Sequence, residues 1–289
     1  MFPSLVWLIT GTSTGLGREL TLAALRRGDK VIATARVRSL SQIDDLKEKG
    51  AATLELDVTA PLEDLQAVAK KAVAIYGQVD IVVNNAGYIL VGAIEENTPQ
   101  ENFDQFNTNV FGAINVTRAF LPYMRERKTG TIIFSGSVGG WRLPRCGFIR
   151  SDEVDFKRHA VITSLHDEIA PLGLRSICID FGYFRTAFLN PDHRKPYIPR
   201  IQDYNEVTGE YEAALQAYNN KQPGDPLRGV EIMVDIVRGE GVAKGKTFSN
   251  NIQLGSDCYE TVKTECEEAL RQLEEWKDVS FSTDFPKGT

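Results

Sequence analysis

Cysteine and histidine are scarce in this chain. Among 289 residues there are four cysteines and three histidines. The cysteines stand at positions 146, 178, 258 and 266, without a CxxC pair and without the density of a disulfide scaffold, so we interpret them as ordinary intracellular thiols. The histidines at positions 159, 166 and 193 do not have the spacing of metal ligands. The sequence therefore predicts neither a disulfide framework nor a metal site.

Basic runs and long apolar runs are also missing. The formal net charge of -6 argues against nucleic acid or an anionic membrane as the main partner. No apolar stretch approaches the length of a membrane span. The opening "MFPSLVWLIT" lacks a basic leader and a small-residue cleavage site, and it runs directly into "GTSTGLG", so we expect a first strand there. These absences favour a cytoplasmic protein that acts on a small molecule.

The sequence does contain a regular alternation of short apolar runs and amphipathic stretches. The apolar runs cover residues 5–10, 31–35, 53–58, 79–85, 130–136 and 174–181. Strands that are apolar along their whole length suit a parallel sheet covered on both faces, and the stretches between them have helical patterns. The sequence predicts an α/β fold with a doubly wound, Rossmann-like parallel sheet.

We expect one domain over residues 1–256, with a C-terminal helix and tail at 257–289. Within the domain, residues 183–225 are rich in proline, tyrosine, asparagine and charge, and they are too many for an ordinary connection. We favour an insertion that covers the substrate over the alternative, a flexible linker. A helix over 226–238 and a strand around 247–254 would complete the domain.

The segment "TGTSTGLG" at residues 10–17 follows the first strand and opens a helix. Its three glycines suit a sharp turn whose bare amide groups meet a pyrophosphate at the N-terminus of a helix. Its position in an alternating domain favours a dinucleotide site over a structural turn.

The spacing of Gly11, Gly15 and Gly17 resembles the short-chain dehydrogenase/reductase family. Further matches are "LDVT" (56–59), "NNAG" (84–87), "NTNVFG" (107–112), "GTIIFSGSVGG" (130–140), "EIAPLGLR" (168–175) and "FGYFRT" (181–186). The resemblance extends over residues 5–255. Within the family, the chain resembles fungal-type NADP-dependent members in particular. It implies an oxidoreductase that interconverts a carbonyl and an alcohol.

The resemblance also implies a set of cofactor-binding residues. They are Gly11, Ser13, Thr14, Gly15, Leu16 and Gly17 in the loop, Asp57 and Val58 against the adenine, Asn84, Ala86 and Gly87 along the cleft, and Thr186 at the nicotinamide end. At the end of the second strand, where an acidic residue would receive a free ribose hydroxyl, this chain has Arg36, with Arg38 close by. Guanidinium groups suit a 2'-phosphate, so NADP(H) is favoured over NAD(H), unless the two arginines are only solvated surface groups.

Hydride transfer to a carbonyl needs a proton donor and groups that hold the oxygen. The family supplies these with an asparagine, a serine and a Tyr-x-x-x-Lys helix, in which the lysine lowers the pKa of the tyrosine. Asn109 matches the asparagine, and Ser137 matches the serine, with Ser135 as a neighbouring alternative. The resemblance makes Asn109 and Ser137 the candidate catalytic residues.

The tyrosine and the lysine have no match. Three alignments of the window place the pair at Arg150 and Val154, at Ser151 and Asp155, or at Ile149 and Glu153. The one Tyr-x-x-x-K in the chain, Tyr259 to Lys263, comes more than a hundred residues too late and is interpreted as coincidence. Tyr183 is only a weak candidate for a replacement of the missing general acid.

The mismatch is confined to residues 143–160. The segment "PRCGFIRSDE" agrees with what the codons of a family-type active-site helix would encode if they were read one base out of frame. This hypothesis predicts that codons 142–163, read one base over, encode Tyr and Lys four residues apart; a splice variant and a native sequence stay as alternatives. As printed, "RSDEVDFKRH" lacks an apolar helical face, which disfavours a packed helix and a homo-oligomer formed through it.

Three functions stay open at this point. The first is an NADP(H)-dependent oxidoreductase of small, mostly apolar molecules that lacks its general acid. The second is an NADP(H)-binding pseudoenzyme. The third is a non-redox catalyst on the same scaffold, with Asp152 or Asp155 as a local acid.

Overall fold

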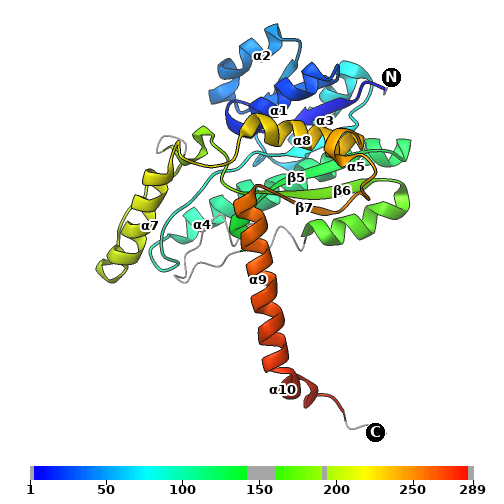
Figure 1. Cartoon of the computed structure of the whole chain (residues 1–289). Helices are drawn as coiled ribbons and strands as arrows, with labels where there is room; N and C mark the ends of the chain where they lie inside the picture. Colours follow the sequence, from blue (N-terminus) through cyan, green and yellow to red (C-terminus); the bar gives the residue numbers. More distant parts are fainter. Residues whose placement is uncertain (1–2, 142–160, 191–193, 286–289) are drawn as a thin grey trace.

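Seven parallel strands form the centre of the molecule (Figure 1). The computed structural model describes residues 3–141, 161–190 and 194–285. The strands are β1 (Val6–Ile9), β2 (Lys30–Ala35), β3 (Ala52–Glu55), β4 (Ile81–Asn84), β5 (Thr131–Ser137), β6 (Arg175–Phe181) and β7 (Asn251–Leu254). They lie in the order β3-β2-β1-β4-β5-β6-β7. The predicted doubly wound parallel sheet is confirmed.

The apolar strands are explained by burial on both faces of the sheet. In β1, Trp7 and Ile9 pack into one core cluster, and Val6 and Leu8 pack into the other. All four residues are buried, because successive side chains of a strand point to opposite faces.

Helices cover both faces and complete the two cores. On the first face lie α1 (Gly15–Arg26), α2 (Asp44–Glu48) and α8 (Pro226–Arg238). On the second lie α3 (Leu62–Tyr76), α5 (Ala113–Arg127) and a helix over residues 161–169. The predicted helix at 226–238 is α8, which Asp225 caps by accepting from the N–H of Leu227 at 2.9 Å.

A π-helix joins two helices beside the sheet. It spans Asn107–Gly112 between α4 (Pro99–Phe106) and α5. A π-helical turn inside an α-helix shifts the side chains that follow it, and such turns are frequent at functional sites. Short 3-10 helices lie at Val37–Ile43, Val138–Gly140, Ala170–Leu172, Ala187–Leu189, Gln202–Tyr204 and Gly241–Ala243.

The predicted insertion contains α7 (Asn205–Tyr218), which lies at one side of the body (Figure 1). A buried carboxylate, Glu96, anchors the segment before this helix. It accepts hydrogen bonds from the N–H groups of Arg200 at 2.9 Å and Ile201 at 3.2 Å. Burial alone would raise the pKa of Glu96, but these N–H groups and that of Ala93 outweigh burial and lower it.

The chain closes with α9 (Ser256–Glu275) and α10 (Lys277–Phe281), which extend away from the sheet (Figure 1). The helix expected after residue 256 is α9. Within the described residues, no helix has both the length and the apolar character needed to cross a bilayer.

Candidate functional site

A cavity of about 640 Å³ lies at the carboxyl ends of the strands. Its walls come from the turn after β1 and from the ends of β2, β4, β5 and β6. Strands β1 and β4 are neighbours in space but not in sequence, so the winding of the chain reverses between them. Ligands of doubly wound sheets bind at such a switch point.

The glycine-rich turn is shaped by close backbone packing. Gly11 and Gly15 have φ values of +70° and +60°, a region that L side chains rarely adopt. A Cβ on Gly17 would lie 2.5 Å from the carbonyl oxygen of Gly11 and 2.5 Å from Nδ2 of Asn85. Thr14 precedes α1 without a side-chain cap, so the first N–H groups of the helix stay available to an anion. The turn thus has the form that a bound pyrophosphate requires.

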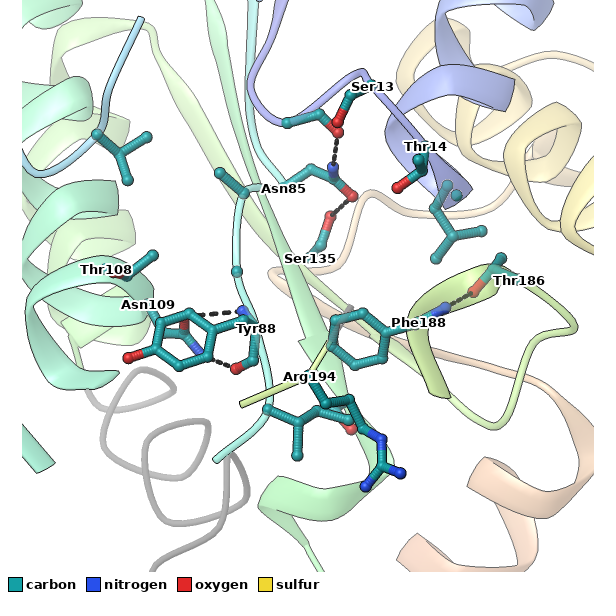
Figure 2. Close-up of a pocket in the computed structure, with 18 of the residues that line it drawn as sticks. Ser13, Thr14, Asn85, Tyr88, Thr108, Asn109, Ser135, Thr186, Phe188 and Arg194 are labelled. Carbon is teal, nitrogen blue, oxygen red and sulfur yellow. Dashed lines mark hydrogen bonds between the residues drawn. The ribbon is translucent and has the colours of Figure 1, made fainter. Parts of the chain in front are cut away.

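Asn85 joins this turn to the end of β4. Its Nδ2 donates to the carbonyl oxygens of Thr10 at 2.9 Å and Gly11 at 3.2 Å, and its Oδ1 accepts from Ser135 at 3.4 Å (Figure 2). Its neighbour Asn84 was expected along the cleft, but Asn84 is buried and donates to Oγ1 of Thr117 at 3.0 Å. Asn84 is not among the residues that line the cavity, whereas Asn85, Ala86 and Gly87 are.

The cavity wall beyond β2 carries two cations. Arg36 and Arg38 both line it, near Asp57 and Val58, and neither forms an ion pair with a described residue. Desolvation at the wall, together with the like charge of Arg38, lowers the pKa of the Arg36 guanidinium. Asp57 accepts from the N–H and the hydroxyl of Thr59, at 2.9 and 2.7 Å, which fixes the loop after β3.

The other end of the cavity is mostly apolar. Ile89, Phe188, Leu189, Tyr211 and Leu215 line it. Three of these side chains, Ile89, Leu189 and Leu215, are buried in one cluster that joins α7 to the segment after β4.

A charged side chain in this apolar end is neutralised by its partner. Arg194 lines the cavity and is buried, and its guanidinium donates to both carboxylate oxygens of Glu212 at 2.7 and 2.8 Å. Burial alone would raise the pKa of Glu212, but the hydrogen bonds from Arg194 and Gln216 outweigh burial and lower it. The ion pair offsets the charge of Arg194 at the cavity and ties α7 to the segment that begins at Arg194.

Comparisons with known proteins agree with this architecture. The profile described as short chain dehydrogenase matches residues 5–196. The chain belongs to the short-chain dehydrogenase family. A short-chain dehydrogenase from Streptomyces avermitilis is 34% identical, with a TM-score of 0.83 over 97% of this chain and 98% of that one.

Two further proteins match along nearly the whole chain. Oxidoreductase BOA17 from Botryotinia fuckeliana is 28% identical over 280 residues, which are 96% of this chain and 98% of that protein. A short chain dehydrogenase/reductase from Burkholderia phymatum, solved in complex with NAD, is 20% identical, with a TM-score of 0.78 over 94% of this chain and 97% of that one. The latter similarity shows the fold alone.

Asn109, a candidate catalytic residue of this short-chain dehydrogenase, lies in the π-helix and is buried. Its Oδ1 accepts from the N–H of Tyr88 at 3.2 Å, and its Nδ2 donates to the carbonyl oxygen of Tyr88 at 3.1 Å (Figure 2). The side chain therefore fixes the backbone directly after Gly87, whether or not it also serves catalysis.

We expect Asn109→Ala to destabilise the protein by about 1–3 kcal/mol, because the N–H of Tyr88 loses its partner, while the carbonyl oxygen of Tyr88 keeps the hydrogen bond from Gln105. The free energy of unfolding in urea measures this loss. Asn115→Ala is the control, because the half-buried Asn115 side chain accepts only from the exposed Arg118, and it should change the free energy of unfolding by less than about 0.5 kcal/mol. Equal effects of the two variants would contradict the assigned role.

Ser137 lies at the end of β5, lines the cavity and accepts from the N–H of Gly139 at 3.1 Å. Ser135 also lines the cavity and donates to Asn85. Thr186 faces the glycine-rich turn: its Cβ would lie 3.7 Å from a Cβ on Gly15, and its Oγ1 accepts from the N–H of Phe188 (Figure 2). The roles of Ser137 and Thr186 toward ligands stay predictions.

The three alignments of the missing pair, at 149 and 153, 150 and 154, and 151 and 155, lie outside the described residues. Tyr259 and Lys263 lie on α9 and do not line the cavity. Tyr183 does line it, and its ring packs edge-on against Tyr218 at 5.1 Å between centroids. Among the described residues, no group of three or more potential ligands is placed to hold a metal ion.

Tyr88 is the aromatic hydroxyl that sequence reasoning overlooked. It lines the cavity beside Asn109. Burial, helped by the negative charge of Asp104, raises the pKa of Tyr88 to about 12. Such a hydroxyl is a weaker acid than free tyrosine, which argues against Tyr88 as a replacement proton donor. Its position directly after "NNAG" was the signal that could have marked it.

Proposed function

We propose that this chain binds NADP(H) and interconverts a carbonyl and an alcohol on a small, mostly apolar molecule. The observation that carries the proposal is the glycine-rich turn packed against Asn85 in the cavity that Arg36 and Arg38 also line, where neither guanidinium group forms an ion pair with a described residue. The bound cofactor would supply or accept the hydride. The fold neighbour from Burkholderia phymatum is described in complex with NAD, which supports a nicotinamide cofactor here as well.

Different residues of the cavity would bind different parts of the cofactor. The N–H groups around Gly15 and Leu16, at the N-terminus of α1, would bind the pyrophosphate. Asp57 and Val58 would meet the adenine, and Thr186 would meet the nicotinamide end. Asn85 holds the turn rigid by donating to the carbonyl oxygens of Thr10 and Gly11.

Arg36 and Arg38 would select the 2'-phosphate, since a guanidinium presents several donors to phosphate oxygens. We expect Arg36→Ala with Arg38→Ala to weaken NADPH binding by about 10- to 100-fold, the effect of losing roughly 1.4–2.8 kcal/mol. NADH binding should change little. Calorimetric titration with both coenzymes measures the difference.

The matched control is Arg228→Ala, an arginine whose side chain is 86% exposed and which is not among the residues that line the cavity. It should leave both affinities unchanged. An equal loss for NADPH and NADH in the double variant would show that the arginines do not read the 2'-phosphate.

The apolar end of the cavity would receive the substrate, next to Phe188, Leu189 and Leu215. Ser137 would hold its oxygen, and Asn109 would support the proton path. The Tyr-Lys pair is absent from the printed sequence at every alignment, so we propose slow turnover. The same absence favours a second candidate, an NADP(H)-binding pseudoenzyme.

A further inference from the structure

Aromatic side chains gather where the end of β6 and the segment after it line the cavity. Phe181, Tyr183, Phe184 and Phe188 all line the cavity from there. The ring of Phe181 packs edge-on against Phe184, with the centroids 5.2 Å apart, and Tyr183 packs edge-on against Tyr218 at 5.1 Å. Phe188 differs from the other three, because its ring has no aromatic or cationic partner among the described residues.

The Phe188 ring is also left out of the packed interior. It is 47% exposed, and within the described part of the chain it is not among the side chains packed in or against the core clusters. Its neighbour Leu189 is buried in the cluster that joins α7 to the segment after β4. Covering an apolar ring that stands uncovered in a cavity removes its surface from water, so the Phe188 ring is a contact surface for a ligand.

The backbone around Phe188 is held on both sides. Phe188 lies in the 3-10 turn Ala187–Leu189, and its N–H donates to Oγ1 of Thr186 at 3.3 Å. After the turn, Oδ1 of Asn190 accepts from Nδ2 of Asn219, which follows α7, at 2.7 Å. Figure 2 shows the ring pointing away from Thr186. A ring on a backbone fixed in this way is ordered before a ligand arrives, which lowers the entropic cost of binding.

The connection to Thr186 sets which end of the cavity the ring serves. The Cβ of Thr186 lies 3.7 Å from the place that a Cβ on Gly15 would take, so the turn with Phe188 begins beside the glycine-rich turn. Under the proposed function, Thr186 meets the nicotinamide end of the cofactor, and Ser137, which lines the same cavity, holds the substrate oxygen. A substrate at that end would therefore meet the Phe188 ring.

We propose that the substrate carries an aromatic ring beside its carbonyl group, and that Phe188 selects this ring; the proposal rests on the proposed function. Aromatic rings pack edge-on or offset because the negative face of one attracts the positive edge of the other, as in the two ring pairs of the same wall. A saturated ring gains only from the apolar area that it buries. The substrate class is therefore aryl ketones or aryl aldehydes and the corresponding alcohols.

The test compares two ketones with the same carbon skeleton, acetophenone and cyclohexyl methyl ketone. Each is titrated into the full-length protein saturated with NADP+, which has no hydride to transfer, and ligand-observed NMR gives the two dissociation constants. We expect acetophenone to bind about 2- to 10-fold more tightly, the usual gain from an aromatic pair. If apolar area alone decided binding, the cyclohexyl ketone would bind at least as tightly, because it has more C–H surface.

Phe188→Leu keeps an apolar side chain but removes the ring. We expect this variant to lose the preference for acetophenone and to keep its affinity for NADP+. Phe103→Leu is the matched control, because Phe103 lies on α4, is 56% exposed and is not among the described residues that line the cavity. The control should keep the preference of the unaltered protein.

Three outcomes would overturn the proposal. They are equal binding of the two ketones by the unaltered protein, a Phe188→Leu variant that keeps the preference, and a Phe188→Leu variant whose affinity for NADP+ falls as much as that for acetophenone, since the ring would then cover the cofactor. A protein that does not bind NADP+ would contradict the proposed function instead. The same ketones, titrated without coenzyme, would then decide the role of Phe188.

Discussion

Gly17→Ala is expected to weaken NADPH binding by about 10- to 100-fold, the effect of roughly 1–3 kcal/mol of overpacking. The added methyl group would lie 2.5 Å from the carbonyl oxygen of Gly11 and from Nδ2 of Asn85, and a backbone atom cannot give way as a flexible side chain can. The turn must therefore open, which displaces the N–H groups that would bind the pyrophosphate. Fluorescence titration with NADPH measures the loss.

The control for this variant is Gly209→Ala, on α7. A Cβ there would have no atom within 4 Å, and the helix gains about 1 kcal/mol of intrinsic propensity from alanine. We expect Gly209→Ala to bind NADPH normally, with a melting temperature that is unchanged or raised. Unchanged NADPH binding in Gly17→Ala would remove the glycine-rich turn from the proposed cofactor site.

The second large effect concerns the missing acid. We expect the double variant Ile149→Tyr with Glu153→Lys to raise the turnover of a carbonyl substrate by on the order of 10²- to 10⁴-fold, the usual contribution of a positioned proton donor. This alignment follows from Pro144, which precedes the helix in the family pattern. The rate of NADPH oxidation with a panel of apolar aldehydes and ketones measures the gain.

The matched control is Ser151→Tyr with Asp155→Lys, which adds the same two residues at a competing alignment. It should leave turnover low, because the alignment set by Pro144 puts the pair two residues earlier in the chain. If neither variant raises turnover, the Tyr-Lys pair is not the missing component, and the pseudoenzyme becomes the better account.

Much of the fold could be predicted from the sequence, because parallel strands that are buried on both faces are apolar along their whole length. The run at 5–10 became β1, and the helix expected at 226–238 has those bounds, set by Pro226 at its start and Gly239 after its end. The glycine-rich turn was predictable for a different reason, since Gly17 has no room for a Cβ and Gly11 and Gly15 have positive φ values.

The details of the site depended on contacts between distant residues. The family resemblance places Asn84 of "NNAG" along the cleft, whereas the structure shows that Asn85 faces the turn and Asn84 faces Thr117. The ion pair of Arg194 with Glu212 and the anchor at Glu96 join segments whose proximity no local pattern reveals.

The most direct test of the account is one titration of the unaltered protein with NADPH, followed by addition of the carbonyl panel to the same sample. Coenzyme fluorescence reports binding, and absorbance reports oxidation. We predict saturable binding of one NADPH per chain, followed by oxidation that is at least about 10²-fold slower than in the variant with tyrosine and lysine restored. Absence of binding would contradict the cofactor site, and oxidation as fast as in that variant would contradict the loss of the proton donor.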